Sequence, residues 1–223
     1  MNKIIVYTAI YGNCVKLTDA IPSENCDFVC FTDNPHLKSN TWEIRYIKGL
    51  TESPRRNARM YKILPHKYFK EYDYSLWVDA KRIPLDAGKF VNKYLKEADI
   101  ALFKHHRRNC IYKELNACIK RKLDDIHVMN KQIEKYKNDG YPVNNGLAST
   151  GVIARKHNEP DIIKAMEGWW REIQNNSVRD QLSFNYIMHT NNLKYYKINK
   201  NIFHNPYIKN SIYGKNPACI KEK

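Results

Sequence analysis

The stretch Tyr74-Ser75-Leu76-Trp77-Val78-Asp79-Ala80-Lys81-Arg82 leads from a run of apolar residues directly into a carboxylate, which two cations follow closely. A short apolar run that ends in polar residues is typical of a buried strand in an α/β sheet. Ligands of such sheets bind beyond the carboxyl ends of the strands, which makes Asp79 a candidate site residue. The structural alternative is that Asp79 only pairs with Lys81 or Arg82 at the surface.

Similar apolar runs and amphipathic stripes lie on both sides of this stretch. Strands are expected at residues 4–9, 28–32, 42–47, 74–79, 100–103 and 152–154. Helices are expected at 53–64, around 90–95, twice within 109–138, at 162–173 with Asn158 as the cap, and from Ser177 onward. This alternation predicts an α/β fold with a mostly parallel central sheet flanked by helices. We expect one domain over residues 1–223, with 205–223 as a polar C-terminal tail.

Composition limits the class of protein without choosing its function. The chain has 223 residues and a formal net charge of +15, which would attract polyanions, anionic lipid surfaces or phosphorylated small molecules. There is no GxGxxG, GxxxxGK[ST] or GxSxG motif and no zinc motif, which argues against dinucleotide, P-loop, serine-hydrolase and zinc sites. The six cysteines form no CxxC pair and are expected to be reduced. With no signal-peptide pattern, we expect a cytoplasmic protein, with peripheral contact to an anionic membrane surface as an option.

Two groups of cations lie where they could bind an anion. Arg55, Arg59 and Lys62 recur at a spacing that places them on one helical face, either as a phosphate clamp or as a solvated basic face. The run His105-His106-Arg107-Arg108 follows a predicted strand, so it lies at a carboxyl end or in an ordinary basic loop. His105 is therefore a candidate donor-binding residue.

The segment Ser177-Val178-Arg179-Asp180-Gln181 has two interpretations. It matches a capping box in outline, with Asp180 reaching back to the Ser177 amide. In the sharper interpretation, Asp180 or Gln181 faces a reacting group. His204 stands alone near the end of the chain, and a lone histidine is more often structural than a ligand.

Six motifs in order resemble a known family. They are Val6–Asn13, Phe31–Asn34, Ala58–His66, Ser75–Lys81, Lys104–Glu114 and Arg179–Phe184. The chain resembles the domain-of-unknown-function family 616, which includes plant mucilage-related, glycosyltransferase-like proteins. That family is similar to GT-A glycosyltransferases, which bind a nucleotide-sugar donor on a Rossmann-like sheet. A looser likeness connects it to the glycogenin-like retaining transferases.

This resemblance implies roles for individual residues. Thr8, Ala9 and Tyr11 would lie against the donor base, and Arg59 and Lys62 near the diphosphate. Asp79 and His204 would hold Mn²⁺ or Mg²⁺, while Asp180 and Gln181 would face the sugar. The chain departs from the glycogenin-like pattern at Lys81, which stands where a second metal-binding carboxylate is usual. Lys81 could itself neutralise the diphosphate in place of an ion.

The expected function is transfer of a hexose or related sugar from a nucleotide diphosphate donor to a hydroxyl acceptor on a glycan or polysaccharide. Asp180 or the donor's own phosphate would accept the acceptor proton, and the Asp-Gln analogy favours retention of configuration. The alternative is a basic nucleic-acid- or glycan-binding module without catalysis. We expect no nucleic-acid partner.

Overall fold

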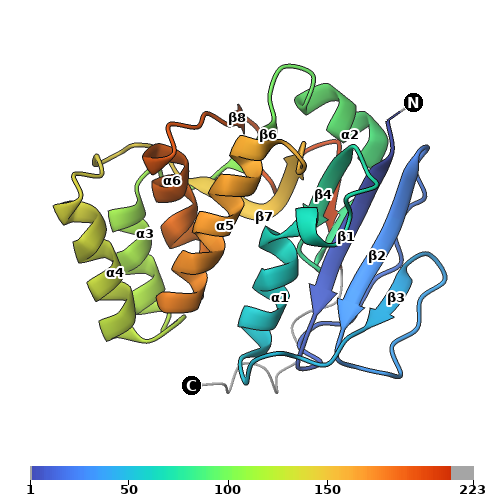
Figure 1. Ribbon diagram of the computed structural model, residues 1–223, viewed down its shortest axis with the longest axis horizontal. Coiled ribbons are helices and arrows are strands. Elements are labelled where there is room, and N and C mark those ends of the chain that lie inside the picture. The colour runs from blue at the N-terminus through green and yellow to red at the C-terminus, as the bar shows by residue number, and fades with distance from the viewer. Residues whose placement is uncertain (1, 212–223) are drawn as a thin grey trace.

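The computed structural model describes residues 2–211 and has a GT-A-like α/β fold (Figure 1). The strands are β1 Ile4–Ile10, β2 Cys26–Thr32, β3 Glu43–Tyr46, β4 Tyr74–Val78, β5 Arg82–Pro84, β6 Ile100–Lys104, β7 Ala148–Arg155, β8 Tyr196–Ile198 and β9 Ile208–Asn210. The helices are α1 Pro54–Ile63, α2 Ala87–Tyr94, α3 Ile111–Lys120, α4 Ile126–Asn138, α5 Pro160–Asn175 and α6 Asp180–Thr190, with a short 3-10 helix at Pro65–Lys67. The predicted strands and helices are all present.

The main sheet has seven strands in the order β3-β2-β1-β4-β7-β6-β8. The β1–β2, β2–β3, β1–β4 and β6–β8 pairs are parallel, which confirms the prediction of a mostly parallel sheet. β7 is the exception, because it enters between β4 and β6 and runs antiparallel to both. As a result the start of β7 lies beside the end of β4, where Asp79 follows.

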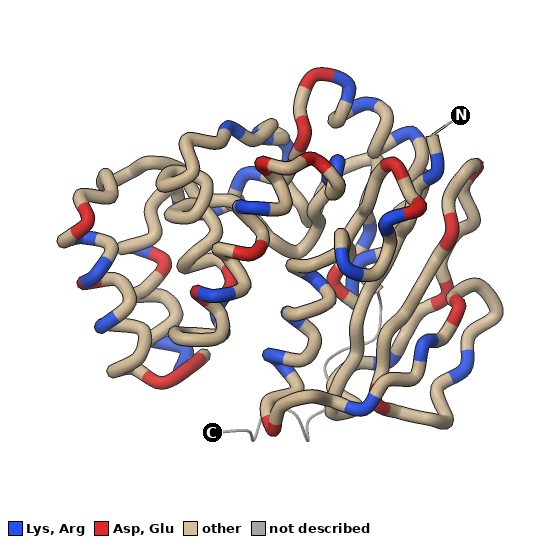
Figure 2. The backbone as a smooth tube through the Cα atoms, viewed as in Figure 1, with Lys and Arg blue, Asp and Glu red and all other residues tan. Residues whose placement is uncertain are grey.

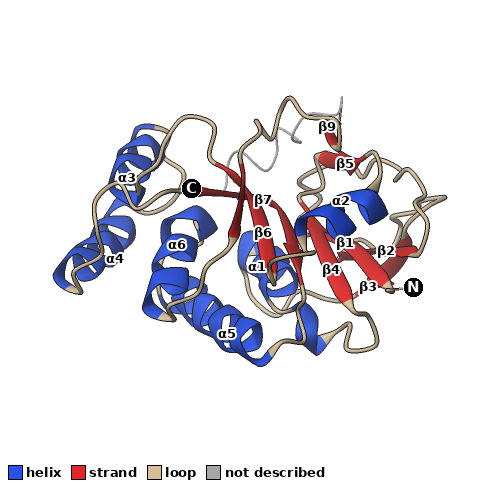
Figure 3. Cartoon of the chain, turned by 90° about the horizontal axis from the view of Figure 1, so that it is seen from above, coloured by secondary structure: helices blue, strands red, loops and turns tan. Residues whose placement is uncertain are grey.

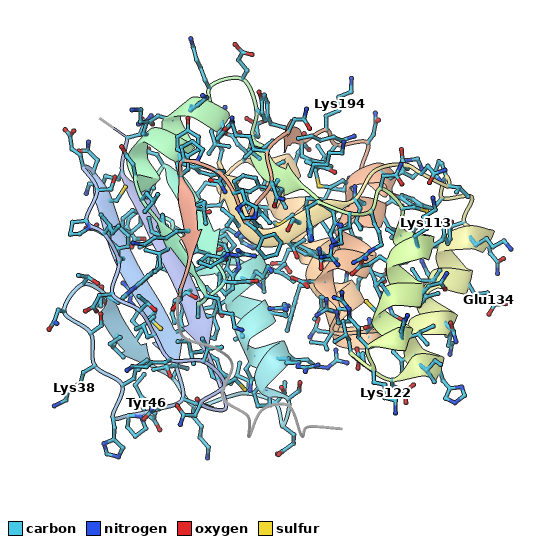
Figure 4. All side chains as sticks on the ribbon, turned by 180° about the vertical axis from the view of Figure 1, so that it is seen from behind. Lys38, Tyr46, Lys113, Lys122, Glu134 and Lys194 are labelled. Atoms are coloured by element: carbon cyan, nitrogen blue, oxygen red, sulfur yellow. The ribbon has the colours of Figure 1, made fainter. Side chains whose placement is uncertain are left out.

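Two apolar layers hold the sheet between helices. One side of the sheet faces α1, α5 and α6, and the other faces α2 and the β5–β9 pair, as the view from above shows (Figure 3). Trp77 and Trp169 are among the largest fully buried side chains on the first side, and Phe90 and Phe103 on the second. Helices α3 and α4 form a pair beyond α6, and Lys122 and Glu134 lie at the outer edge of that pair (Figure 4). The sheet therefore provides a rigid base for the residues that follow its strands.

Helix α1 begins where the sequence predicted. Ser53 is the N-cap, its side chain accepts the Arg56 amide proton, and Pro54 occupies the first turn. Asn158 is not the cap of α5, so that prediction is wrong. The N-cap is Glu159, while the Asn158 amide donates to the backbone oxygens of Lys70 and Tyr72. Asn158 therefore ties α5 to the loop before β4 instead of starting the helix.

The C-terminal segment is part of the fold as far as the structure describes it. β9 pairs antiparallel with β5, and Ile208 is buried, so residues 205–211 pack against the domain. Residues 212–223 of the predicted tail lie outside the described residues. Cys26, Cys30, Cys110 and Cys118 are free thiols, whereas Cys14 is disulfide-bonded, so the expectation of reduced cysteines is wrong for Cys14.

The positive charge is spread over the molecule. Figure 2 shows Lys and Arg in every part of the chain, interleaved with Asp and Glu, and recurring along α1. None of the helices in residues 2–211 is long and apolar enough to cross a bilayer. The local charges around Asp79 carry more information.

Candidate active site

Asp79 follows β4 at the centre of the sheet. Its amide donates to the Gly151 oxygen of β7 at 2.8 Å, and its Oδ1 accepts from the Trp77 indole at 2.9 Å. The Asp79 side chain is 41% exposed. These two bonds hold the Asp79 backbone and one carboxylate oxygen in place. The rest of the carboxylate stays open to solvent, where it can contact a ligand.

Lys62 lies directly beneath this carboxylate. Its ammonium Nζ is 3.4 Å from Asp79 Oδ1 and 2.5 Å from Asp180 Oδ2, and its side chain is 1% exposed. The last turn of α1 thus delivers a buried cation between two carboxylates that are far apart in the sequence. Because the ammonium is enclosed, Lys62 lines neither of the two cavities described below. It would influence a bound ligand only by positioning Asp79 and Asp180 and by its charge.

Asp180 is the first residue of α6 and is almost completely buried. Besides Lys62, its Oδ2 accepts from the Thr150 hydroxyl at 3.0 Å and lies 3.3 Å from Arg59 Nε. Burial alone would raise the pKa of Asp180, but the charges of Arg59, Lys62 and Arg179 outweigh it and hold the pKa well below its usual range. Asp180 is therefore a firmly ionised carboxylate.

The capping alternative for Ser177 does not describe this helix. The N-cap of α6 is Arg179, and the Asp180 carboxylate turns toward Lys62 and Thr150. Ser177 instead donates to Asp124 at 2.6 Å and accepts the Arg179 amide proton at 3.1 Å. These contacts hold the turn before α6, so Asp180 enters the site already oriented.

Two cavities meet at Asp79. The first, which we call the apolar pocket, has a volume of about 270 Å³. Its walls come from the end of β1, the start of α1 and the residues after β4, and include Ala9, Tyr11, Ala58, Trp77 and Lys81. Tyr11 and Tyr61 stack with ring centroids 5.7 Å apart, which stiffens this wall. Rigid aromatic and aliphatic walls of this kind suit a flat heterocycle.

The second cavity, which we call the arginine pocket, has a volume of about 360 Å³. Among the described residues six arginines line it: Arg59, Arg82, Arg107, Arg108, Arg121 and Arg179. The carboxylates in its lining are Asp79, Glu114 and Asp180. Arg59, Asp79 and Arg179 line both cavities, so the two are joined at the site residues. An anion that enters here meets more positive than negative charge.

His105 organises one wall of the arginine pocket. Its ring is buried, and its Nδ1 accepts the amide protons of Arg107 at 3.2 Å and Arg108 at 3.0 Å. Since Nδ1 accepts both bonds, the ring proton is assigned to Nε2, which faces Glu114 at 3.9 Å. Burial lowers the pKa of His105 to about 4, helped by Arg108 and opposed by Glu114. His105 thus shapes the loop that presents the arginines.

Replacing His105 tests this positioning role. His105→Asn keeps a hydrogen-bond acceptor near the Nδ1 position and should preserve the loop, whereas His105→Leu should disorder it and weaken ligand binding in the arginine pocket. Between pH 6.5 and about 4 the unfolded chain takes up a proton that folded His105 does not, so acidification lowers the free energy of unfolding. Urea titrations across this pH range should show that the free energy of unfolding depends less steeply on pH in both variants than in the parent chain. An unchanged slope would contradict the assignment.

The structure brings most of the predicted site residues together. Ala9, Tyr11, Arg59, Asp79 and Lys81 line the apolar pocket. A further group lines the arginine pocket: Arg59, Asp79, His105, Asp180 and Gln181. The Gln181 amide donates to the Ala148 oxygen at 3.3 Å, which fixes its side chain at the start of β7.

Thr8 and His204 do not reach these cavities. Thr8 is completely buried within β1, and His204 is exposed in the loop after β8. Neither residue is part of the lining of the two pockets. The expected contact of Thr8 with a base, and the expected pairing of Asp79 with His204 on one ion, therefore find no support in the described geometry.

The protein side chains around Asp79 do not by themselves complete a divalent-ion site. Magnesium and manganese sites generally need several oxygen ligands. Within residues 2–211 no group of three or more histidine, cysteine, aspartate or glutamate side chains could hold a metal. The second carboxylate, Asp180, is already bound by Lys62 at 2.5 Å, and a divalent ion beside that ammonium would be repelled. We derive no step through a metal.

Sequence reasoning missed Thr150, Arg121 and Arg179. Thr150 lies in β7, which reaches Asp180 only because β7 inserts beside β4. Arg121 follows α3 and looks like any exposed helix-terminal cation. Arg179 was seen only as part of a motif, although it lines both pockets. Each of these contacts joins segments distant in the sequence, and no local pattern signals them.

Comparisons with known proteins agree with the fold. The Arabidopsis thaliana protein "Probable hexosyltransferase MUCI70" is 27% identical over 163 residues, which covers 67% of this chain and 28% of that protein. The chain thus spans little more than a quarter of the length of this relative. The apo structure of WbbM, a bifunctional glycosyltransferase, matches with a TM-score of 0.52 and 11% identity, covering 88% of this chain and 39% of that one. At this identity the match supports the fold alone.

The comparison with protein families decides the relationship. A model described as "TOD1/MUCI70, glycosyltransferase-like domain" matches residues 2–214, which is nearly the whole chain. The match confirms the resemblance that the six ordered motifs indicated. The chain belongs to the TOD1/MUCI70 glycosyltransferase-like domain family.

Proposed function

We propose that this domain transfers a hexose or related sugar from a nucleotide diphosphate donor to a hydroxyl acceptor. The observation that carries the proposal is the meeting of an apolar and a cationic cavity at Asp79, beside the buried Asp180–Lys62 pair. The nucleoside would occupy the apolar pocket, and the acceptor the arginine pocket. The sugar would lie between them, against Asp79 and Gln181.

The cations of the apolar pocket suit a departing diphosphate. Arg55, Arg59 and Lys81 line it, and Arg55 is held by a 2.8 Å bond to the Leu123 oxygen. Fixed cations stabilise charge that develops on a leaving group without reorganising during the reaction. In this proposal the bond from the anomeric carbon to the diphosphate oxygen breaks, and its electron pair leaves with the nucleoside diphosphate. A bond to the acceptor oxygen forms.

The low pKa of Asp180 favours a role in stabilising charge over a role as the base. A carboxylate that stays ionised so firmly is a weak base, so it is poorly suited to accept the acceptor proton. It suits stabilisation of the positive charge that develops on the sugar ring. We propose that the diphosphate oxygen takes the proton, and that configuration is retained. Proton NMR of the anomeric signal of the first product tests the stereochemistry.

A thermal-shift screen of nucleotide sugars tests the proposed function. A donor at a hundredfold excess over its Kd stabilises by ~2.7 kcal/mol, which raises the Tm of a domain this size by roughly 5–10 °C. Ala58→Leu narrows the apolar pocket and should abolish the shift, whereas Ala117→Leu, in the lining of the arginine pocket alone, should keep it. If no nucleotide sugar raises the Tm of the parent chain, the proposal fails.

The same screen tests the metal. Because the protein side chains around Asp79 and Lys62 do not by themselves complete a divalent-ion site, we expect the nucleotide-induced shift to be the same in EDTA and in Mn²⁺. Sugar transfer, measured in parallel, should be equally insensitive. A shift that appears only with Mn²⁺ and disappears in Asp79→Asn would show that Asp79 binds an ion with the donor.

A further inference from the structure

The arginine pocket carries more positive charge than a diphosphate needs. Four of its arginines, Arg82, Arg107, Arg108 and Arg121, take no part in the lining of the apolar pocket. They come from the start of β5, the loop after β6 and the C-cap of α3, so three separate segments supply them. Convergence of cations from three segments on one cavity indicates a binding site for an anion.

Three of these arginines have no carboxylate partner within residues 2–211. Arg108 pairs with Glu114, whose side chain is 4% exposed. Arg82, Arg107 and Arg121 form no ion pair with any carboxylate in the part of the chain that the structure describes. Arg82 is instead held by neutral groups, since it donates to Asn210 and lies 4.4 Å from the centre of the Phe203 ring. Its charge is oriented but not neutralised.

The donor does not account for this surplus. The apolar pocket has its own cations in Arg55, Arg59 and Lys81, which are enough to face two phosphates. Asp180, which lines the arginine pocket, is already surrounded by Lys62 and Arg59. The charges of Arg82, Arg107 and Arg121 therefore remain available to the molecule that enters from the other side.

We propose that the acceptor is an anionic saccharide whose carboxylate or phosphate binds Arg82, Arg107 and Arg121. This inference rests on the proposed function, because it assigns the acceptor of the same reaction. Guanidinium groups bind carboxylate and phosphate through two parallel hydrogen bonds, which fixes orientation as well as affinity. The anion would anchor the saccharide so that one of its hydroxyls reaches the anomeric carbon beside Asp79.

Binding to matched saccharide pairs tests the proposal. The probes are uronic-acid oligosaccharides with their carboxyl-reduced forms, and phosphorylated oligosaccharides with their dephosphorylated forms. Calorimetry at physiological salt should show at least one acidic member binding tenfold or more tightly than its neutral form, a difference of ~1.4 kcal/mol. The two arms distinguish a carboxylate from a phosphate. Equal affinity within every pair, or no binding of any acidic member, would overturn the proposal.

Charge-matched variants separate the pocket from the general basicity of the chain. Arg107→Gln and Arg121→Gln should each weaken the favoured acidic probe about tenfold. Arg171→Gln removes the same charge from an exposed position of α5 that lines neither pocket, and it should change the affinity less than twofold. If Arg171→Gln and Arg121→Gln lower the affinity for the acidic probe equally, the attraction is non-specific and the proposal is wrong.

The nucleotide thermal shift keeps the two proposals apart. If nucleotide sugars stabilise the chain and every saccharide pair binds equally, the acceptor assignment is wrong and the donor site stands. If no nucleotide sugar binds and an acidic saccharide still requires Arg121, the transferase proposal fails. The arginine pocket would then be a binding site for acidic glycans.

Discussion

Asp180→Asn is expected to lower kcat/KM for sugar transfer by about 10²–10³, the range found when one fixed electrostatic contact to a transition state is removed. Asp180 is buried and ionised, is held by Lys62 and Thr150, and lines the arginine pocket next to Asp79. The amide keeps the size and the Thr150 bond but loses the charge. Initial rates with saturating donor, at a temperature below the Tm of the variant, measure the effect.

The chain offers a matched control for this substitution. Asp161 lies in the first turn of α5 as Asp180 lies in the first turn of α6, so both interact with the positive end of a helix. Asp161 is exposed and is part of neither pocket. Asp161→Asn should therefore leave kcat/KM within about twofold while losing a similar helix-dipole contribution. Parent-like activity in Asp180→Asn would remove Asp180 from the mechanism.

Lys62→Met should give the largest loss of stability. The substitution keeps an unbranched apolar stem and removes the ammonium, which leaves the buried Asp180 with fewer compensating charges. Breaking a buried ion pair in this way costs about 3–5 kcal/mol in the free energy of unfolding. Activity should fall with it, because Asp79 and Asp180 lose the group that holds them. Urea unfolding and initial rates on the same preparation measure both effects.

A double-mutant cycle isolates the pair from general damage to the core. Lys62→Met combined with Asp180→Asn should be more stable than the sum of the single effects predicts, because neither a lone Lys62 ammonium nor a lone Asp180 carboxylate remains buried. Lys156→Met serves as the control, since Lys156 pairs with Asp99 at the surface with side chains 27% and 55% exposed. That loss should be about 1 kcal/mol or less. A Lys62 effect equal to the Lys156 effect would contradict the buried cation.

The positions of the strands and helices could be predicted from the sequence because each element shows its own hydrophobic periodicity. The run before Asp79 predicted β4, and Ser53-Pro54 predicted the start of α1, and both are present. The spacing of Arg55, Arg59 and Lys62 predicted one face, but it could not show that Lys62 is enclosed while Arg55 stays at a pocket wall. That difference depends on where β4 and α6 lie, which no local pattern encodes.

The site shows the same division between local and distant information. Asp79 and Asp180 could be proposed from motifs, but their shared partner Lys62 follows from tertiary packing alone. The direction of β7 was equally hidden, since an apolar strand reads the same in either orientation. His204 was chosen by analogy, and it is exposed in the loop after β8 and lines neither cavity. Of the residues assigned through the resemblance, Ala9 and Tyr11 line the apolar pocket, whereas Thr8 and His204 line neither cavity.

The antiparallel insertion of β7 has a consequence for the order of synthesis. When β4 leaves the ribosome, the edge that pairs with β7 has no partner until the chain has been extended as far as residues 152–155. At roughly 5–20 residues per second this takes several seconds, during which an apolar strand edge can pair with other chains. A fragment that stops before β7 should therefore aggregate, and co-translational chaperones should act chiefly on the first half of this domain.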